Sequence, residues 1–340
     1  MKRVVSFGEI MLRLAPNGYY RFFQDDQLQA TFGGAEANVA VGLANFGLDS
    51  AYVTKLPSHA IGQAAVDCLR AFGVDTSSIV RGGERVGIYF LEKGVAQRAS
   101  VCVYDRAHSA ISEASPSDFD WDAIFDGADW FHFTGITPAL GSDVAEICRR
   151  ACVAAKARGL TVSFDPNYRA KLWSEERAAA TFKTLLPYVD VLIVNESQAQ
   201  SLFSVSIPEC ERDGDNVSDA GYLALAREIA DRYKIGRVVL SERRTVSAHE
   251  GYFCGKYYDG ERLYSSARHH LEIVDRVGGG DAFAAGVIYA LLSEKPAGKA
   301  IEFAAAASAL KHTVEGDFNR VSVAEVEKLA EGSSCGRVQR

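Results

Sequence analysis

Asp275-Arg-Val-Gly-Gly-Gly-Asp-Ala-Phe-Ala-Ala-Gly286 is the stretch of sequence that decides the fold, because three glycines lead directly into an aspartate and an apolar helical pattern. Gly278, Gly279 and Gly280 leave backbone N–H groups uncovered and let an anion approach the chain closely. A helix that begins near Asp281 directs its partially positive end at the same point. The stretch therefore predicts an anion-binding turn that leads into a helix.

Asp281 is the candidate catalytic group of this turn. Its carboxylate can accept the proton of a hydroxyl that attacks a phosphoryl group held by the glycine N–H groups. An ordinary helix start, capped by an aspartate, is the alternative. Neither G-x-x-x-x-G-K-[ST] nor G-x-G-x-x-G after a strand occurs in the chain, which disfavours a P-loop NTPase and a simple dinucleotide-binding domain.

Length and charge limit the class of protein. A chain of 340 residues fits one large α/β domain with one or two inserted segments that lie outside its main body. A formal net charge of −7 argues against nucleic acid or an anionic membrane as the main partner. No apolar run is long enough to span a bilayer, and Met1-Lys-Arg3 leads into a strand pattern rather than a signal-peptide core. We therefore expect a cytoplasmic protein.

The seven cysteines indicate reduced thiols. They form an odd set without a C-x-x-C pair, which argues against a disulfide framework and against a structural zinc site. Cys148 and Cys152 are four residues apart in a helical pattern and could face one another.

After the first third of the chain, short β-rich runs alternate with helical segments. The expected strands are Trp130–Phe133, Leu160–Phe164, Val189–Val194 and Arg237–Leu240, with helices expected over 143–158 and 221–233 among others. This alternation predicts a parallel sheet covered by helices. Ligands of such sheets gather where strands end, and the polar segments Asp165–Arg169 and Asn195–Glu196 follow two of these strands.

Two stretches of the N-terminal third interrupt this alternation. Residues 17–32 are rich in aromatic side chains without a helical period, and residues 86–105 contain two β-rich runs around Gly94. They predict a small sheet that stands off the main domain. Such a sheet could close over a substrate and exclude water, or it could serve as a dimer contact, and the two roles are compatible.

Gly33-Gly-Ala-Glu-Ala-Asn38 opens a further helix. The glycine pair allows a polyol to approach the backbone, and the amide of Asn38 offers a donor and an acceptor to sugar hydroxyls. A structural capping turn is the competing interpretation.

Three ordered motifs now give a resemblance that covers nearly the whole chain. Gly33-Gly34-x-x-x-Asn38, Asp165-Pro-Asn-Tyr-Arg169 and Gly278-Gly-Gly-Asp281 together resemble the ribokinase-like (PfkB) carbohydrate kinases. Within that family, Phe7–Leu14, Gly33–Ala40 and Asp275–Asp281 are most similar to 2-keto-3-deoxygluconate kinases.

The resemblance implies a doubly wound, mostly parallel α/β fold with a small β lid. The large domain, comprising 1–14, 34–85 and 108–340, would bind nucleotide and substrate, and 15–33 and 86–107 would form the lid. The implied reaction moves the γ-phosphoryl of ATP, with Mg²⁺, to the 6-hydroxyl of 2-keto-3-deoxygluconate. Asp281 would be the general base, and the 278–281 backbone would be the anion hole.

The resemblance also implies two sets of binding residues. Those of the sugar-acid pocket are Gly34, Asn38, Tyr89, Tyr104, Arg106, Arg169 and Asp281, and those on the nucleotide side are Asn195, Ser241, Gly278, Gly280 and His312. Arg106, which follows a lid strand, is a plausible partner for the carboxylate that a neutral sugar lacks. An unpaired surface arginine is the alternative for Arg106, and Arg169 discriminates less between substrates.

The nucleotide side departs from the family pattern in two places. In Asn195-Glu-Ser-Gln198, glutamine replaces the final glutamate of Asn-x-x-Glu, so Mg²⁺ would be held mainly by ATP phosphates and water, or with help from Glu196. Leu240–Thr245 lacks the usual Gly-rich turn, and Arg243 or Arg244 could contact phosphates there, or both could be solvated. Asp275 and Val277 align with positions that bind a monovalent cation in some relatives, which predicts activation by K⁺.

Alternatives to the sugar-acid kinase stay open at this point. The same chemistry could act on fructose, another neutral sugar or a nucleoside, and 2-keto-3-deoxygalactonate could be a second substrate. A catalytically silent sugar-binding or regulatory protein is a further alternative. Lid sheets with exposed apolar side chains favour a homo-oligomer formed through the lid.

Overall fold

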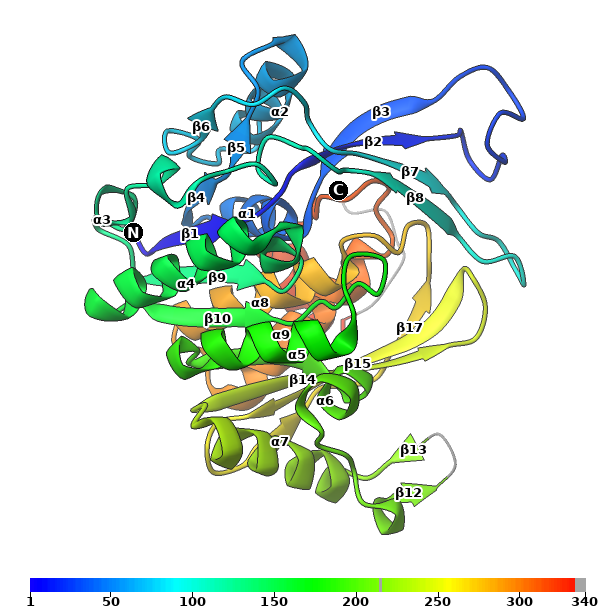
Figure 1. The fold of residues 1–340 in the computed structure, drawn as a ribbon. Coiled ribbons are helices and arrows are strands. Elements are labelled where there is room, and N and C mark those ends of the chain that lie inside the picture. Colours follow the sequence, from blue (N-terminus) through cyan, green and yellow to red (C-terminus); the bar gives the residue numbers. More distant parts are fainter. Residues whose placement is uncertain (214–215, 334–340) are drawn as a thin grey trace.

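A nine-stranded, mostly parallel sheet forms the centre of the fold in the computed structural model, which describes residues 1–213 and 216–333 (Figure 1). The strand order is β16-β15-β14-β11-β10-β9-β1-β4, with β17 paired to β15. The strands are β1 (Arg3–Phe7), β4 (Asp49–Val53), β9 (Trp130–Thr134), β10 (Thr161–Asp165), β11 (Val191–Asn195), β14 (Arg237–Thr245), β15 (Glu250–Tyr258), β16 (Leu263–Ser265) and β17 (His269–Glu272). From β4 to β14 all neighbours are parallel, which confirms the predicted parallel sheet.

Helices cover both faces of this sheet, which is why its central strands are apolar along their length. One face packs against α3 (Trp121–Ile124), α4 (Ser142–Ala157), α5 (Glu175–Leu185), α6 (Glu196–Phe203) and α7 (Asp219–Tyr233). The other packs against α1 (Ala35–Asn45), α8 (Gly279–Leu292), α9 (Ala297–Lys311) and α10 (Val323–Ala330), and α2 (Ala60–Arg70) packs beside α1. Figure 1 shows α4 and α5 in front of the sheet and α8 and α9 behind it. The predicted doubly wound α/β fold is confirmed.

Several short elements connect these layers. They are β5 (Lys55–Leu56), β6 (Val80–Arg81), β12 (Arg212–Asp213), β13 (Asn216–Val217), and the 3₁₀ turns Pro116–Asp118, Thr137–Leu140, Leu186–Tyr188 and Glu209–Glu211.

A separate four-stranded sheet projects from the domain. Its order is β3-β2-β7-β8, with β2 (Met11–Ala15), β3 (Gln29–Gly33), β7 (Ile88–Glu92) and β8 (Val101–Asp105). The predicted small sheet therefore exists, but its boundary differs from the expected residue 15. β2 belongs to it because Leu12 and Arg13 pair with β3 on one side and with β7 on the other.

The tip of this sheet contacts the turn between β14 and β15. The Ala248 N–H donates to the Ala96 carbonyl at 2.8 Å, and the Ala96 N–H donates to His249 Nδ1 at 3.0 Å. Lys93 also lies 2.6 Å from Glu315. The sheet thus stands over the carboxyl end of the central strands, as a lid would, and closure over a substrate stays a prediction.

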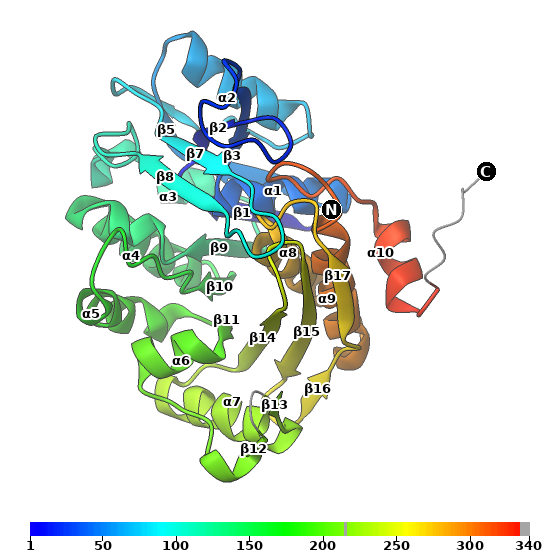
Figure 2. The same ribbon diagram turned by 90° about the vertical axis from the view of Figure 1, so that its right-hand side faces the viewer.

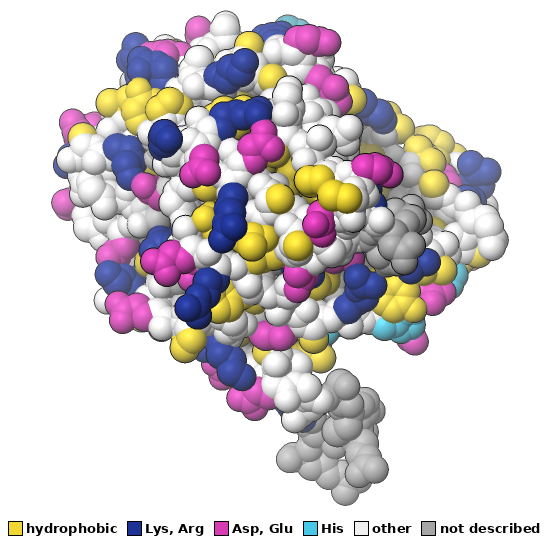
Figure 3. All heavy atoms as spheres, turned by 90° about the horizontal axis from the view of Figure 1, so that it is seen from below, with side chains coloured by type: hydrophobic (Ala, Val, Ile, Leu, Met, Phe, Trp, Pro, Cys, Tyr) yellow, Lys and Arg dark blue, Asp and Glu magenta, His cyan; other side chains and the backbone are white. Residues whose placement is uncertain are grey.

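The surface seen from below carries interspersed charges. Figure 3 shows Lys and Arg side chains alternating with Asp and Glu, so neither sign forms a continuous patch on that face. On the lid, Val101 and Val103 of β8 are 40% and 48% exposed. Pairing of two lids through such side chains stays a prediction.

Among residues 1–213 and 216–333, no helix has the length and apolar character that crossing a bilayer requires. Cys148 and Cys152 are buried free thiols on one face of α4. Cys335 lies outside the described residues.

Candidate active site

A cavity of about 350 Å³ lies where the carboxyl ends of β10 and β11, the glycine turn before α8 and the lid meet. This is the crevice in which open parallel sheets bind ligands. Figure 2 views the molecule from the side on which the lid projects, with β7 and β8 toward the reader. The cavity collects all three motifs, although they lie far apart in the sequence.

The glycine turn presents its backbone to this cavity. Gly278 is the N-cap of α8 and has φ 82°, a left-handed conformation that favours glycine. A Cβ atom on Gly278 would lie 2.1 Å from the Asp317 carbonyl oxygen, and one on Gly279 would lie 2.3 Å from His312 Cε1. The first N–H groups of a helix lack intrahelical acceptors. The turn is thus a helix start at which glycine is required, and anion binding there stays a prediction.

Asp281 stands in the first turn of α8 and meets the Gly33-Gly34 motif. Its Oδ2 accepts a hydrogen bond from Asn38 Nδ2 at 2.7 Å, and Asn38 Oδ1 accepts the Gly34 N–H at 3.3 Å. Burial in the cavity wall raises the pKa of Asp281 to about 6, although the Asn38 hydrogen bond and the Arg169 charge oppose the rise. A carboxylate with this pKa is a competent base near neutral pH.

Asp165, at the end of β10, is a second carboxylate of the cavity. Burial and the nearby charge of Asp281 raise the pKa of Asp165 to about 7, against the hydrogen bond that it accepts from the Asn167 N–H. The two aspartates therefore disfavour each other's ionisation.

The two predicted arginines differ in how they are used. Arg106 is buried and paired with Glu9 Oε2, with a 2.8 Å hydrogen bond from Nε, and Ser109 Oγ donates to Glu9 Oε1 at 2.6 Å. Arg169 donates only to the carbonyls of Asn167 and Tyr168, at 3.2 and 3.1 Å. Within the described parts of the chain, no carboxylate lies within ion-pair distance of Arg169.

Tyr89 and Tyr104 form the lid wall of the cavity, with ring centroids 6.1 Å apart. Tyr89 donates to both carboxylate oxygens of Asp317, at 2.6 and 2.7 Å, and Arg13 Nη1 donates to Asp317 Oδ1 at 2.8 Å. Asp317 thus ties the lid to the loop after α9. Glu9 and Asp317 also line the cavity, and Arg13 contacts Asp317 from outside this lining; none of the three is among the predicted site residues.

The nucleotide-side residues Asn195, which ends β11, and Ser241, which is its partner in the middle of β14, line the cavity. Asn195 Oδ1 accepts the Gln198 N–H at 2.9 Å, and Gln198 Oε1 accepts the Asn195 N–H at 3.1 Å, which makes a capping box. Gln198 therefore keeps a capping role that glutamate can also perform. Glu196 is not free for a metal ion, because it pairs with Arg212.

Most of the predicted site residues are brought together in the cavity wall. They are Gly34, Asn38, Tyr89, Tyr104, Arg106, Arg169, Asn195, Ser241, Val277, Gly278, Gly280 and Asp281. Three lie behind this wall: Gly279, His312 and Asp275. His312 packs beneath Gly279, with its Nδ1 2.6 Å from the Ser308 carbonyl oxygen, and burial lowers the pKa of its ring to about 4. In this structure His312 supports the turn from behind.

Arg243 is a further basic residue of the cavity. Its guanidinium lies 5.5 Å from the Phe253 ring centroid, and its Nη2 would lie 2.9 Å from a Cβ atom on Gly280. It therefore brings a positive charge to the mouth of the glycine turn. Within residues 1–213 and 216–333, no group of three or more His, Cys, Asp or Glu side chains is arranged to hold a metal ion.

Comparison with known proteins settles the family. Residues 1–322 match the pfkB family carbohydrate kinase description. The chain belongs to the PfkB family of carbohydrate kinases. The predicted family is thereby confirmed, and with it the assignment of the protein as a carbohydrate kinase.

Three similar proteins illustrate the range of this PfkB kinase's relatives. A 2-dehydro-3-deoxygalactonokinase from Haloferax volcanii is 33% identical over 335 residues, which are 98% of each chain. A 2-dehydro-3-deoxygluconokinase structure from Thermotoga maritima is 48% identical, with a TM-score of 0.94 and coverage of 98% of this chain and 100% of that one. A fructokinase with bound ATP from Xylella fastidiosa shares the fold at 24% identity, with a TM-score of 0.74 and coverage of 97% and 98%.

Proposed function

We propose that this PfkB kinase is a sugar-acid kinase that transfers the γ-phosphoryl group of ATP to the 6-hydroxyl of 2-keto-3-deoxygluconate. The observation that carries the proposal is the Arg169 guanidinium, which has no carboxylate partner among residues 1–213 and 216–333 and lies in the same cavity as Asp281 and the glycine turn. A carboxylate-bearing substrate would satisfy this charge, which a neutral sugar cannot do. The similarity to the Haloferax and Thermotoga sugar-acid kinases supports it.

Phosphoryl transfer would take place between Asp281 and the glycine turn. The attacking hydroxyl lies beside Asp281, whose carboxylate takes the proton as the new oxygen–phosphorus bond forms. Asn38 holds that carboxylate in place through its 2.7 Å hydrogen bond. The backbone N–H groups at Gly278–Asp281, at the positive end of α8, stabilise the negative charge on the transferring group.

ATP would extend from the glycine turn toward Asn195 and Ser241. Arg243 stands at this mouth and supplies a positive charge to the phosphates. Mg²⁺ would arrive with the nucleotide, keep several waters and be assisted by Asp165, the cavity carboxylate without a side-chain partner among the described residues. When bound, the ion neutralises charge on the β- and γ-phosphates.

The sugar acid would lie under the lid, between Tyr89, Tyr104 and Asn38. Arg169 would bind the carboxylate of the sugar acid. Arg106, whose charge is already neutralised by Glu9, would form the adjacent part of the cavity wall. This shifts the main charge recognition from the Arg106 of the sequence prediction to Arg169. The lid would exclude water, which competes with the sugar hydroxyl for the phosphoryl group.

ADP release by the purified protein tests the proposal. With Mg²⁺ and ATP, we expect turnover of 2-keto-3-deoxygluconate, of 2-keto-3-deoxygalactonate, or of both, and little with fructose, ribose or adenosine. Arg169→Gln should lower kcat/KM for the keto-deoxy acid by about 10- to 100-fold, the loss expected for one charge-assisted contact. The outward Arg177→Gln on α5 is the matched control. Preference for a neutral sugar, or an unchanged Arg169→Gln enzyme, would contradict the carboxylate pocket.

The pH dependence of kcat/KM provides an independent check on the base. Because the pKa of Asp281 is raised to about 6, the active, ionised form should be lost as pH falls through that value. We expect kcat/KM to drop about tenfold per pH unit below the inflection and to level off above it. Asp165→Asn should leave the inflection in place, because the pKa of Asp165 is raised to about 7 and its carboxyl group is therefore mostly neutral where Asp281 titrates. Loss of the inflection in Asp165→Asn would assign the titration to Asp165 rather than to Asp281.

A further inference from the structure

Four buried charged side chains lie behind the glycine turn. Arg13 comes from β2, Asp275 precedes the turn, Lys311 ends α9 and Asp317 lies in the following loop. Their exposed fractions are 3%, 2%, 0% and 4%, respectively. These four residues, here named the buried ion cluster, contain two cations and two carboxylates.

The carboxylate of Asp275 accepts three hydrogen bonds. Oδ1 accepts the Val277 N–H at 3.0 Å, and Oδ2 accepts the Gly316 N–H at 3.1 Å. Arg13 Nη2 donates to the same Oδ2 at 2.6 Å. The Arg13 guanidinium neutralises this carboxylate and would repel a K⁺ ion beside it, so the residues present do not fit the expected K⁺ site at Asp275 and Val277.

Lys311 lies directly beneath the turn itself. Its Nζ donates to the Val314 carbonyl at 3.0 Å, and its Cε would lie 3.1 Å from a Cβ atom on Gly278. Burial lowers the pKa of Lys311, while the charges of Asp275 and Asp317 act in the opposite direction. The Val314 carbonyl accepts a hydrogen bond from the ammonium group, and the charges of Asp275 and Asp317 also favour a cation here, which is an environment that would suit a bound monovalent cation.

The positive charges of the buried ion cluster affect how well the glycine turn can bind an anion on its cavity side. Asp275 and Asp317 alone would repel the phosphates that approach the Gly278–Asp281 backbone. Arg13 and Lys311 cancel that repulsion. Lys311 also fills the space under Gly278, so it helps to hold the turn in its left-handed conformation.

We propose that the ammonium group of Lys311 is a built-in cation that positions the glycine turn, so that phosphoryl transfer by this protein needs no added K⁺. The inference rests on the proposed kinase reaction at this site. Lys311 is a positioning residue, because it acts through the turn and does not reach the cavity wall.

The first test uses the unmodified protein. With ATP as its Tris salt, turnover is measured in KCl and in tetramethylammonium chloride at equal ionic strength, which keeps screening constant. We expect the same kcat in both salts. A wild-type rate that requires K⁺ would overturn the proposal without any variant.

The second test uses Lys311→Met, which keeps the length of the side chain and removes its charge. In tetramethylammonium chloride we expect kcat/KM for ATP to fall by about tenfold or more, as when an electrostatic support of the transition state is lost. K⁺ or NH₄⁺ should restore most of the loss, because either ion can occupy the vacated position. A folded variant that keeps full activity, or that loses activity and is not rescued by either cation, would contradict the proposal.

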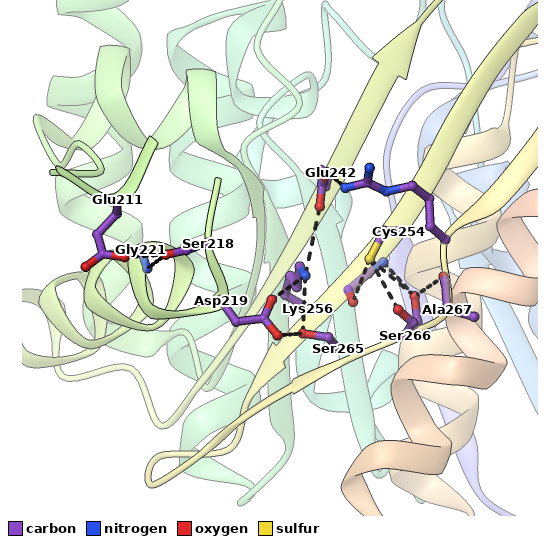
Figure 4. Close-up of polar contacts among 12 residues, drawn as sticks. Glu211, Ser218, Asp219, Gly221, Glu242, Cys254, Lys256, Ser265, Ser266 and Ala267 are labelled. Atoms are coloured by element: carbon purple, nitrogen blue, oxygen red, sulfur yellow. Dashed lines mark hydrogen bonds and ion pairs between the residues drawn. The ribbon is translucent and has the colours of Figure 1, made fainter. Parts of the chain in front are cut away.

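Lys256→Met is the matched control, since Lys256 is also a buried lysine whose Nζ is held by oxygen atoms of the protein. Figure 4 shows Lys256 among Asp219, Ser265 and Glu242, and its Nζ is 2.6 Å from Asp219 Oδ1 and 3.2 Å from Ser265 Oγ. Lys256 is absent from the cavity lining. We expect Lys256→Met to unfold at a lower temperature than wild type and to show no response to K⁺ or NH₄⁺. If K⁺ or NH₄⁺ raised the activity of Lys256→Met as much as that of Lys311→Met, the rescue would reflect general stabilisation of the fold by cations and not a cation site under the glycine turn.

Titration calorimetry with a non-hydrolysable ATP analogue separates this inference from the proposed function. If no sugar is phosphorylated, the kinase proposal fails, but analogue affinity still reports on the turn. We expect wild-type affinity to be equal in the two salts and Lys311→Met affinity to be raised by K⁺. Wild-type affinity that depends on K⁺ would overturn the built-in cation even if turnover of the sugar acid is found.

Discussion

Asp281→Asn should lower kcat by about a hundredfold or more, the loss typical of a missing general base, and should leave the binding of sugar and ATP largely intact. Asparagine has almost the shape of aspartate, and its side-chain oxygen can still accept the hydrogen bond that Asn38 donates at 2.7 Å. The turn should therefore keep its geometry, while the group that takes the proton is lost. Steady-state kinetics and titration with an ATP analogue measure the two effects separately.

Asp143→Asn provides the control for this variant. Asp143 also lies in the first turn of a helix, but α4 is remote from the cavity lining. We expect wild-type kcat from it. Retained turnover by Asp281→Asn would remove Asp281 from the role of base and leave its raised pKa as a consequence of burial alone.

The sequence predicted the architecture well because the central strands are read directly from apolar runs. Val189–Val194 was expected to be a strand, and β11 covers Val191–Asn195. The helix expected over 143–158 is α4, Ser142–Ala157, whose buried side chains recur at helical spacing. Burial on both faces makes such strands apolar throughout, which local sequence displays clearly.

The lid boundary was harder to predict, because pairing of distant strands decides it. Met11–Ala15 follows β1 closely and reads as part of the main domain. Its partners are β3 and β7, and β7 is more than seventy residues away. The hydrophobic pattern of Met11–Ala15 carries no information about which distant strand it pairs with.

The cavity shows the same division between local and distant information. Gly278–Asp281 and Gly33–Asn38 were predicted site motifs, because glycine turns and helix starts have local signatures. That Glu9 neutralises Arg106, or that Arg13 pairs with Asp275 and Asp317, depends on contacts between distant segments. The resemblance and its place after a lid strand therefore pointed to Arg106, whereas the pairing in the folded chain leaves Arg169 available.

Gly278→Ala should have the second largest effect, because this residue combines a left-handed backbone with close packing. At φ 82°, an alanine costs about 1–2 kcal/mol. Its Cβ would also lie 2.1 Å from the Asp317 carbonyl oxygen, so the turn or the 317 loop has to move. The backbone N–H groups of the turn would then be displaced from the transferring phosphoryl group. Because one lost anion-hole donor lowers kcat by about 10²- to 10³-fold, we expect a loss of that size.

Gly159→Ala separates backbone strain from the loss of the anion site. Gly159 has φ 74° and no atom within 4 Å of a Cβ at its position, so alanine there meets similar strain without a clash. Both variants should unfold at lower temperature than wild type, and only Gly278→Ala should lose activity and ATP-analogue affinity. If Gly278→Ala kept its kcat while losing stability, the turn would be a structural helix start and the phosphoryl group would have to be stabilised elsewhere. If Gly159→Ala lost as much activity, instability rather than a displaced anion site would account for the effect.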